Sequence, residues 1–206
     1  MRAMFSNCTS LVKLDIAKFN TQNVIDMGYT FENLNEITSL NVSNFNTQNV
    51  TTMVRIFYNL YNLTSLDVSN FKTQNLINMG SMFCRCYKLT TLDVSHFNTK
   101  NANNMAFMFY ELRNIRFLNV SNFNTQKVTS MREMFVRCYS LRILDISNFK
   151  TENVVNMNSM FYECGSLQHL DFANFNMKNV IDMDNMIYGC YSLSSSDIAI
   201  LKNKIK

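Results

Sequence analysis

The sequence predicts an α/β repeat solenoid, with one parallel strand and one short helix in each 26-residue turn. Three observations predict this fold. Four columns of apolar residues recur at a fixed period without insertion or deletion. Apolar and polar residues alternate in the first part of each unit, and apolar residues recur at steps of three and four in the second. Gly and Pro, the usual turn residues of a globular domain, number only four and zero.

The period is visible in columns of identical or similar residues. Each column keeps the spacing of 26 residues along the chain. The columns are Phe19, Phe45, Phe71, Phe97, Phe123, Phe149 and Phe175; Met27, Met53, Met79, Met105, Met131, Met157 and Met183; Phe5, Phe31, Phe57, Phe83, Phe109, Phe135, Phe161 and Ile187; and Leu14, Leu40, Leu66, Leu92, Leu118, Leu144 and Leu170.

The unit that begins at Leu63 shows the expected strand. Leu66 and Val68 alternate with Asp67 and Ser69. A period of two sends one pair of side chains to the core and the other pair to solvent. The sequence therefore predicts a parallel strand at the start of each unit.

The second part of the same unit shows the expected helix. Leu76, Met79, Met82, Phe83 and Cys86 follow one another at steps of three or four, which places them on one face of a helix or of a tight helical turn. One unit cannot cover this face alone, whereas stacked units form a continuous core.

Two columns of asparagine replace the missing turn residues. Asn side chains hydrogen-bond to nearby backbone groups, and in a stacked array we expect them to bond from one repeat to the next. The first column precedes the Phe19 column and the second precedes the expected helix. They are Asn44, Asn70, His96, Asn122, Asn148 and Asn174, and Asn23, Asn49, Asn75, Asn101, Lys127, Asn153 and Asn179.

The run Leu-x-x-Leu-Asp-x-Ser-x-Phe-x-Thr-x-Asn-Val-x-x-Met-x-x-Met-Phe-x-x-Cys, at Leu141 to Cys164, resembles the BspA-type leucine-rich repeat. The resemblance covers essentially all of residues 1–193. It implies a leucine-rich-repeat solenoid in surface proteins of bacteria and protists that attach to host proteins or matrix, and it implies no catalytic residues. The glycine that often precedes the Cys occurs only as Gly189, and the Cys is replaced by Leu34, Leu60 and Leu112.

The two ends differ from the middle of the chain. Residues 1–193 are expected to form about eight repeats, the first of them incomplete, and residues 194–206 a C-terminal capping helix. Asp197 is the expected N-cap of that helix, with Lys202 and Lys204 near its C-terminal end. The first unit begins at its helix without a covering strand, which favours a fragment of a longer protein.

Composition and charge argue against several classes of protein. The net charge of +4 comes without a dense basic stripe, which argues against a nucleic-acid partner. No run of eighteen apolar residues occurs, which argues against membrane insertion. Met1 to Cys8 has no apolar signal-peptide core. The family resemblance implies a cell-surface or extracellular location. Because this N-terminus has no signal-peptide core, a cytoplasmic location also stays open.

Candidate chemistry is sparse, and we predict no enzyme, no metal site and no cofactor. The two histidines, His96 and His169, are nearly three repeats apart. Parallel Cβ atoms about 4.8 Å apart exceed the usual ~3.8 Å of a disulfide, so buried free thiols are favoured in the Cys column. A column of aspartates on the strand face could hold a cation between turns, but local bonds to Ser and backbone groups are favoured: Asp15, Asp67, Asp93, Asp145, Asp171 and Asp197.

A binding surface is expected where the chain departs from its own repeat. On the strand face, Ser and Thr of the early units give way to Arg116, Phe117, Arg142, Ile143, Gln168 and His169, which are our candidate binding residues. Two tyrosine columns near the end of the expected helix are the second departure. The predicted function is a non-catalytic protein-interaction or adhesion module for a host or matrix protein. The alternatives are a structural spacer within a larger repeat protein and a soluble intracellular scaffold.

Overall fold

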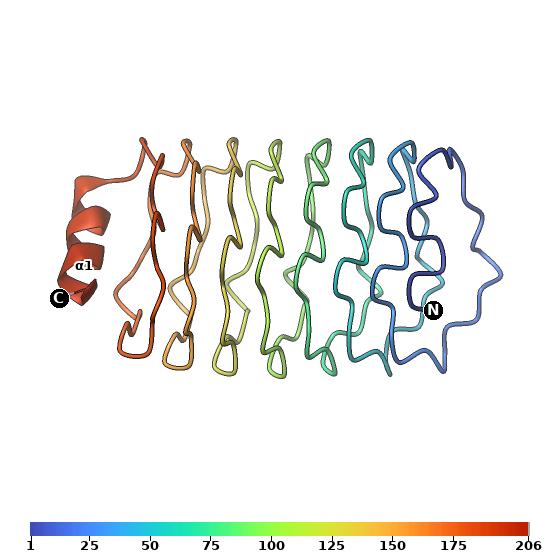
Figure 1. Ribbon diagram of the computed structural model, residues 1–206, viewed down its shortest axis with the longest axis horizontal. Helices are drawn as coiled ribbons and strands as arrows, with labels where there is room; N and C mark the ends of the chain where they lie inside the picture. Colours follow the sequence, from blue (N-terminus) through green and yellow to red (C-terminus); the bar gives the residue numbers. More distant parts are fainter. Residues whose placement is uncertain (206) are drawn as a thin grey trace.

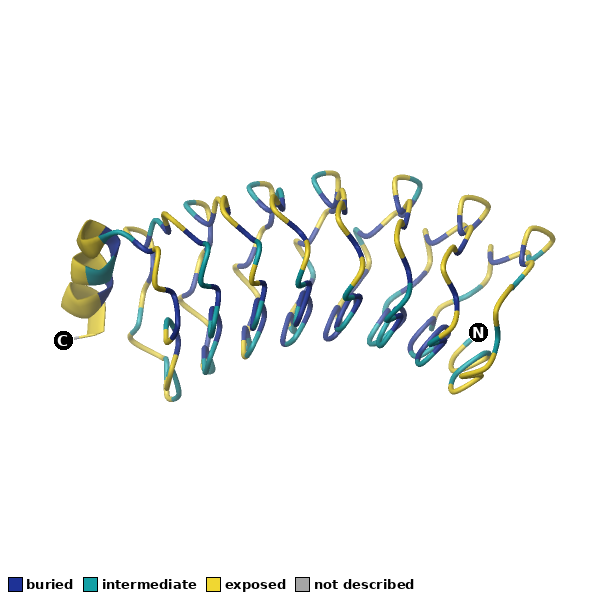
Figure 2. Ribbon diagram, turned by 90° about the horizontal axis from the view of Figure 1, so that it is seen from above, coloured by how far each residue is buried: buried dark blue, intermediate teal, exposed yellow. Residues whose placement is uncertain are grey.

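The computed structural model describes residues 1–205 as a solenoid closed at its C-terminal end by one helix. The repeats stack side by side along the long axis, and helix α1 (Ser195–Ile205) lies across the last of them (Figure 1). Viewed from above, the stack forms a gentle arch (Figure 2). We number the repeats from the N-terminus, so that residues 79–86 belong to the fourth.

Two rows of isolated parallel bridges connect the repeats, and the second row is interrupted between Ser65 and Phe117. The first row runs without a break from Asp26 through Thr52 to Asp182. The second row pairs Ser39 with Ser65, and Ile143 with both Phe117 and His169. The expected parallel strand is thus reduced to isolated bridges.

The reason for the short strands lies in the aspartate column. The Asp67 side chain accepts the backbone N–H of Ser69 at 2.9 Å, and Phe71 N–H donates to the Val68 carbonyl at 2.9 Å. These local bonds turn the chain within three residues of the bridge at Ser65. Burial nevertheless alternates as predicted, because Leu66 and Val68 are buried and Asp67 is exposed.

The helix expected in each repeat is not formed, and α1 is the only helix among residues 1–205. In its place each repeat has a tight-turn segment, and these segments are residues 1–8, 27–34, 53–60, 79–86, 105–112, 131–138, 157–164 and 183–190. Within residues 79–86, Met82 N–H donates to the Met79 carbonyl, three residues back. Ser81 and Phe83 instead donate to the next repeat, to the carbonyls of Ala106 and Met108 at 2.8 and 3.0 Å.

This alternation rules out a helix, because half of the N–H groups pair between repeats instead of along the segment. It also requires two left-handed residues per segment, such as Ser81 and Arg85 with φ of 55° and 61°. Fifteen residues other than glycine adopt positive φ in this way.

The predicted apolar columns form one continuous core. The side chains of Met79, Met82 and Phe83 are fully buried, and their equivalents in the inner repeats are buried as well. Phe83 stacks on Phe57 and Phe109, with ring centroids 5.7 and 5.9 Å apart. The prediction that these columns are core residues is therefore confirmed.

The corners of the solenoid are held by the predicted asparagines. Asn70 Nδ2 donates to the carbonyls of Ser43 and Phe45 in the preceding repeat, at 3.0 and 2.9 Å. His96 takes the same role through its contact of 3.0 Å with the Val68 carbonyl. In the second column, Asn75 Nδ2 donates to the Gln48 carbonyl at 2.9 Å. Bonding from repeat to repeat is thus confirmed.

A buried threonine column completes each corner. Thr73 Oγ1 accepts the N–H of Asn98 at 2.7 Å and donates to the carbonyl of the same residue at 3.2 Å. The hydroxyl therefore satisfies both backbone groups of a residue in the next repeat. The same pair of bonds recurs along the column at Thr21, Thr47, Thr99, Thr125 and Thr151.

The cysteines lie within residues 1–205, and all six are free. Cys86 Sγ contacts the carbonyl of Phe57 at 3.1 Å, and Cys164 Sγ that of Phe135 at 2.8 Å. Burial raises the pKa of the Cys86 thiol to about 12. These thiols are therefore neutral core groups at physiological pH.

The C-terminal helix begins differently from the prediction. Ser194, not Asp197, is the N-cap of α1, because Ser194 Oγ accepts the N–H of Asp197 at 3.1 Å. Asp197 occupies the third helical position and is almost fully buried. Its side chain hydrogen-bonds to Leu170 and His169 of the last repeat instead.

Candidate functional site

The six predicted binding residues lie on adjacent rungs of the second bridge row. Ile143 is bridge-paired to Phe117 on one side and to His169 on the other. Arg142 N–H donates to the Arg116 carbonyl at 3.0 Å. The structure therefore brings these residues together on one face, the strand-face patch, which we define as Arg116, Phe117, Arg142, Ile143, Gln168 and His169.

The patch exposes apolar surface beside cationic groups. Phe117 and Ile143 are 57% and 60% exposed, although both sit on a packed backbone. Arg116 and Arg142 precede them directly in sequence and are also exposed. Aromatic, aliphatic and guanidinium groups in this arrangement are typical of the centre of a protein interface.

The His169 end of the patch is anchored to the C-terminal helix. His169 Nδ1 lies 2.8 Å from Asp197 Oδ2, and the same oxygen accepts the N–H of Leu170 at 3.1 Å. Burial disfavours the charged carboxylate, but bonds from Ser194, Leu170 and His169 outweigh it and hold the pKa of Asp197 below its ordinary value. The imidazole is thereby oriented while most of the ring remains in solvent.

Two open hollows adjoin the patch. The larger, of about 580 Å³, is lined by Phe117 and Arg116 together with Thr91 and Asp93 of the preceding repeat. The smaller, of about 250 Å³, lies beside Ile143. Each hollow is open to solvent, so that side chains of a partner could enter it.

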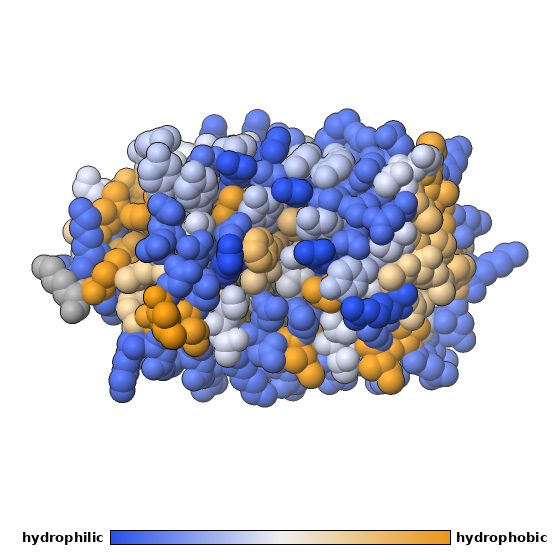
Figure 3. All heavy atoms as spheres, in the orientation of Figure 1, coloured by the Kyte–Doolittle hydropathy of each residue, from blue (hydrophilic) through white to orange (hydrophobic). Residues whose placement is uncertain are grey.

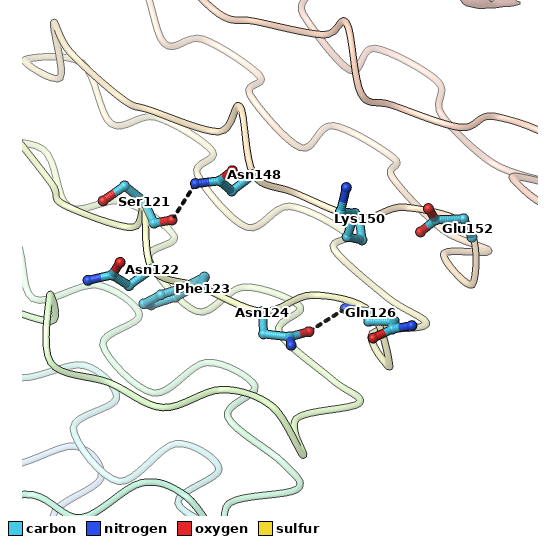
Figure 4. Close-up of a pocket in the computed structure, with 8 residues that line it drawn as sticks. All are labelled: Ser121, Asn122, Phe123, Asn124, Gln126, Asn148, Lys150 and Glu152. Carbon is cyan, nitrogen blue, oxygen red and sulfur yellow. Dashed lines mark hydrogen bonds between the residues drawn. The ribbon is translucent and has the colours of Figure 1, made fainter.

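A third hollow, on the corners, has a structural explanation. Its lining is polar and includes Asn148, whose Nδ2 donates to the Ser121 carbonyl, and Asn124, whose Oδ1 accepts the N–H of Gln126 (Figure 4). The same bonds recur at the corners of the other repeats. We therefore assign no ligand to this hollow.

The tight-turn face carries a charge network that the sequence reasoning missed. Figure 3 looks onto this face, which is largely hydrophilic over the central repeats and carries a continuous apolar area at the N-terminal end. The centre of the charge network is Glu111, which is almost fully buried. Its carboxylate lies 3.2–3.4 Å from the guanidinium groups of Arg85, Arg113 and Arg137. Arg137 also pairs with Glu163 at 2.8 Å. The signal was present, since Arg85, Glu111, Arg137 and Glu163 alternate in charge at the repeat spacing.

The network holds its buried carboxylate in the ionised form. Burial opposes ionisation of Glu111, but hydrogen bonds with Tyr87, Arg137 and Arg113 lower its pKa below the ordinary value of 4.5. The two predicted tyrosine columns frame the network, and Arg113 lies over the ring of Tyr87 at 4.1 Å from its centroid. Residues of both sets therefore serve to stabilise the fold.

Among residues 1–205, no three His, Cys, Asp or Glu side chains lie close enough together to hold a metal ion. Over the same residues, no helix has the length and apolar character needed to cross a membrane.

The fold defines the class of the protein as a repeat solenoid of leucine-rich-repeat type, with Leu66 and its equivalents facing the core beside parallel bridges. The chain belongs to the family described as "Mycoplasma protein of unknown function, DUF285", which it matches over residues 1–117 and again over 109–201. No curated protein matches the sequence.

Two solved structures are similar to the chain. One is a leucine-rich repeat protein of Leptospira interrogans, with 15% identity and a TM-score of 0.41 over 84% of this chain. The other is a leucine-rich repeat protein of Bacteroides ovatus, with 14% identity and a TM-score of 0.35 over 81% of this chain. The match spans 42% and 50% of the lengths of these two proteins.

Proposed function

We propose that the chain is a non-catalytic protein-interaction module of BspA-like type, in which residues 1–193 form the binding array and residues 194–206 its cap. We assign it to a cell-surface protein, with a host or matrix protein as partner. The strand-face patch is the proposed binding surface. The observation that carries this proposal is the exposure of Phe117 and Ile143 on adjacent rungs.

The chemistry of the patch supports a protein partner. The equivalent positions in the early repeats are Ser39, Ser65 and Thr91. Replacing them with a phenyl ring and a branched alkyl group gains nothing for the core, because both side chains remain in solvent. Burial of such groups against a partner would contribute favourable free energy of about 25 cal/mol for each Å² of apolar surface removed from water.

The proposal is tested by restoring the pattern of the early repeats. The variant Phe117→Ser, Arg142→Thr and Ile143→Ser keeps every buried contact, so we expect its unfolding midpoint to change little. Binding of both proteins to a panel of purified matrix and host surface proteins is measured by surface plasmon resonance. For any protein bound by the parent, the variant should bind at least about tenfold more weakly, since interface centres carry most of the binding energy.

The matched control is the double variant Ile25→Ser and Ile181→Ser. These side chains are also exposed, at 62% and 85%, but they lie beside the first bridge row. The control should bind like the parent. Equal binding by the parent and the triple variant would show that the patch is a harmless departure from the repeat, and would leave the spacer as the better description.

A further inference from the structure

The tyrosine column on the tight-turn face, which runs from Tyr58 to Tyr188, is interrupted at Cys84 and again at Val136. Tyr58 and Tyr110 belong to the third and fifth repeats, and the equivalent residue of the fourth repeat is Cys84. Where the column is continuous, as at Tyr162 and Tyr188, the rings stack with centroids 5.3 Å apart. The place of one ring is therefore vacated between Tyr58 and Tyr110.

A hollow of about 160 Å³ lies at this position. Its floor is formed by Ser81 and Cys84, both nearly buried, and its walls include Tyr58, Phe107 and Tyr110. A cavity of roughly 150 Å³ is large enough to hold benzene. Burial raises the pKa of the Cys84 thiol, so that the floor is a neutral group with little nucleophilic character.

Two arginines border the hollow, and each lies over the ring of one of its tyrosine walls. The Arg55 guanidinium lies 4.8 Å from the centroid of Tyr58, and that of Arg85 lies 5.6 Å from the centroid of Tyr110. Their carboxylate contacts, to Glu32 and Glu111, are both long at 3.4 Å. Arg85 makes its contact with Glu111 through Nε, which is buried and forms no hydrogen bond.

The carboxylate at the edge of the hollow forms no ion pair with Arg55 or Arg85 among residues 1–205. Glu133 also lines the hollow, but its Oε1 accepts a bond of 2.9 Å from Arg132. Guanidinium groups with unused donors bind planar or tetrahedral anions well. Aromatic walls next to such donors favour a ligand that is both flat and negatively charged.

We propose that the slot formed by Arg55, Tyr58, Cys84, Arg85 and Tyr110 binds an aromatic ring that carries an anionic group. The ring takes the vacated place in the tyrosine column, and the anion accepts hydrogen bonds from the two arginines. A phosphorylated or sulfated tyrosine of a protein, or a free aromatic acid, has this chemistry. This site is separate from the strand-face patch, and neither depends on the other.

The first test uses phenyl phosphate as the probe with the full chain, followed by NMR or calorimetry. Phenyl phosphate should bind saturably and at least about tenfold more tightly than phenol or inorganic phosphate, because only it uses both ring and anion. A phosphotyrosine peptide and benzoate then stand for the two sources, a protein ligand and a free aromatic acid. Tighter binding of the peptide than of phenyl phosphate indicates a protein ligand. Equal binding of the two indicates a small molecule. Absence of saturable binding of phenyl phosphate would overturn the proposal.

The second test fills the slot. Cys84→Tyr restores the column, and we expect it to lower the affinity for phenyl phosphate at least tenfold. The control is Val136→Tyr, which fills the equivalent position two repeats further on and should keep the parent's affinity within twofold. Arg55→Gln, at a half-exposed side chain, should weaken phenyl phosphate binding about fivefold or more and leave phenol unaffected. Unchanged affinity in Arg55→Gln, or in a folded Cys84→Tyr, would refute the site.

Discussion

Polar side chains in this solenoid hydrogen-bond to equivalent residues of the neighbouring repeats. On the tight-turn face, Asn33 Nδ2 donates to Asn7 Oδ1, and Asn59 Nδ2 donates to Asn33 Oδ1, each at 2.6 Å. An amide both donates and accepts, so one residue type can repeat along a column. Arg only donates and Glu only accepts, so a charged column must alternate, as it does from Arg85 to Glu163.

The junction between the two kinds of column is imperfect. Asn59 Oδ1 and Arg85 Nε are neighbours in the column, and both are buried without a hydrogen-bond partner. The amide ladder thus ends on an unpaired acceptor, and Arg85 Nε lies 3.4 Å from Glu111 in the next repeat.

Glu111→Gln tests the charged column. Removing the carboxylate leaves three arginines without their shared partner, and we expect a loss of about 2 kcal/mol at pH 7, which is below the usual cost of breaking a buried pair because the arginines are partly exposed. The folded pKa of Glu111 is lowered, so its contribution is present above about pH 4.5 and is lost as the pH falls below that value.

Urea denaturation at pH 7 and at about pH 3 measures both effects. The difference between parent and variant should shrink markedly at the lower pH. Glu36→Gln is the control, since Glu36 is exposed and makes no ion pair within residues 1–205, and we expect a change within about 0.5 kcal/mol. An equal difference at both pH values would contradict the role given to Glu111.

At the scale of the element, the tight-turn segment carries backbone strain that glycine would remove. Each segment has two left-handed positions, and Gly189, with φ of 80°, is the only glycine at such a position among residues 1–205. A left-handed conformation costs other residues roughly 1–2 kcal/mol. The array offsets this cost with hydrogen bonds between repeats, such as Ser159 N–H to the Asp184 carbonyl at 2.8 Å.

Ser159→Gly should therefore stabilise the protein. Ser159 has φ of 53° and its hydroxyl makes no bond within the described residues, so the change relieves strain at little other cost. We expect a gain of about 1 kcal/mol in the free energy of unfolding, measured by urea denaturation. Ser166→Gly is the control at a position without positive φ, where the added chain entropy should make the change neutral or slightly destabilising. A loss of stability in Ser159→Gly would contradict the strain argument.

Which residues of the tight-turn segment are buried was predictable from the sequence, but the backbone conformation of the segment was not. Met79, Met82 and Phe83 are spaced for one face of a helix, and a row of tight turns buries residues at the same steps. The two differ in where the N–H groups donate, which side-chain spacing does not encode. Asn33 and Asn59 at left-handed positions were the available hint, since Asn tolerates that conformation.

The candidate binding sites were also only partly predictable from the sequence. Phe117 and Ile143 were found because they depart from a column of Ser and Thr, and the bridges place them side by side. The gap at Cys84 is visible in the same way, as a departure from the column of Tyr58 and Tyr110. The arginines that border it were not predictable, because the spacing does not show that Arg55 and Arg85 lie over those two rings.

At the scale of the whole molecule, stability is a sum over neighbouring repeats, so the ends matter more than their size suggests. The C-terminal end is closed by α1, which packs Leu201 against the core. Asp197 joins this helix to the eighth repeat through the N–H of Leu170 and the imidazole of His169. One buried carboxylate thus connects the cap to the edge of the strand-face patch.

Asp197→Ala should open the solenoid from this end. The change leaves the buried N–H of Leu170 without a partner and removes the contact to His169, for an expected loss of about 2–3 kcal/mol. Because repeats contact only their neighbours, faster amide hydrogen exchange should appear in residues 165–205 and not in the fourth repeat. The control is Lys204→Ala, which removes an exposed bond to the Ala173 carbonyl and should cost less than about 0.5 kcal/mol. Uniformly faster exchange along the whole chain would show instead that the array unfolds as one unit, with the cap serving all repeats equally.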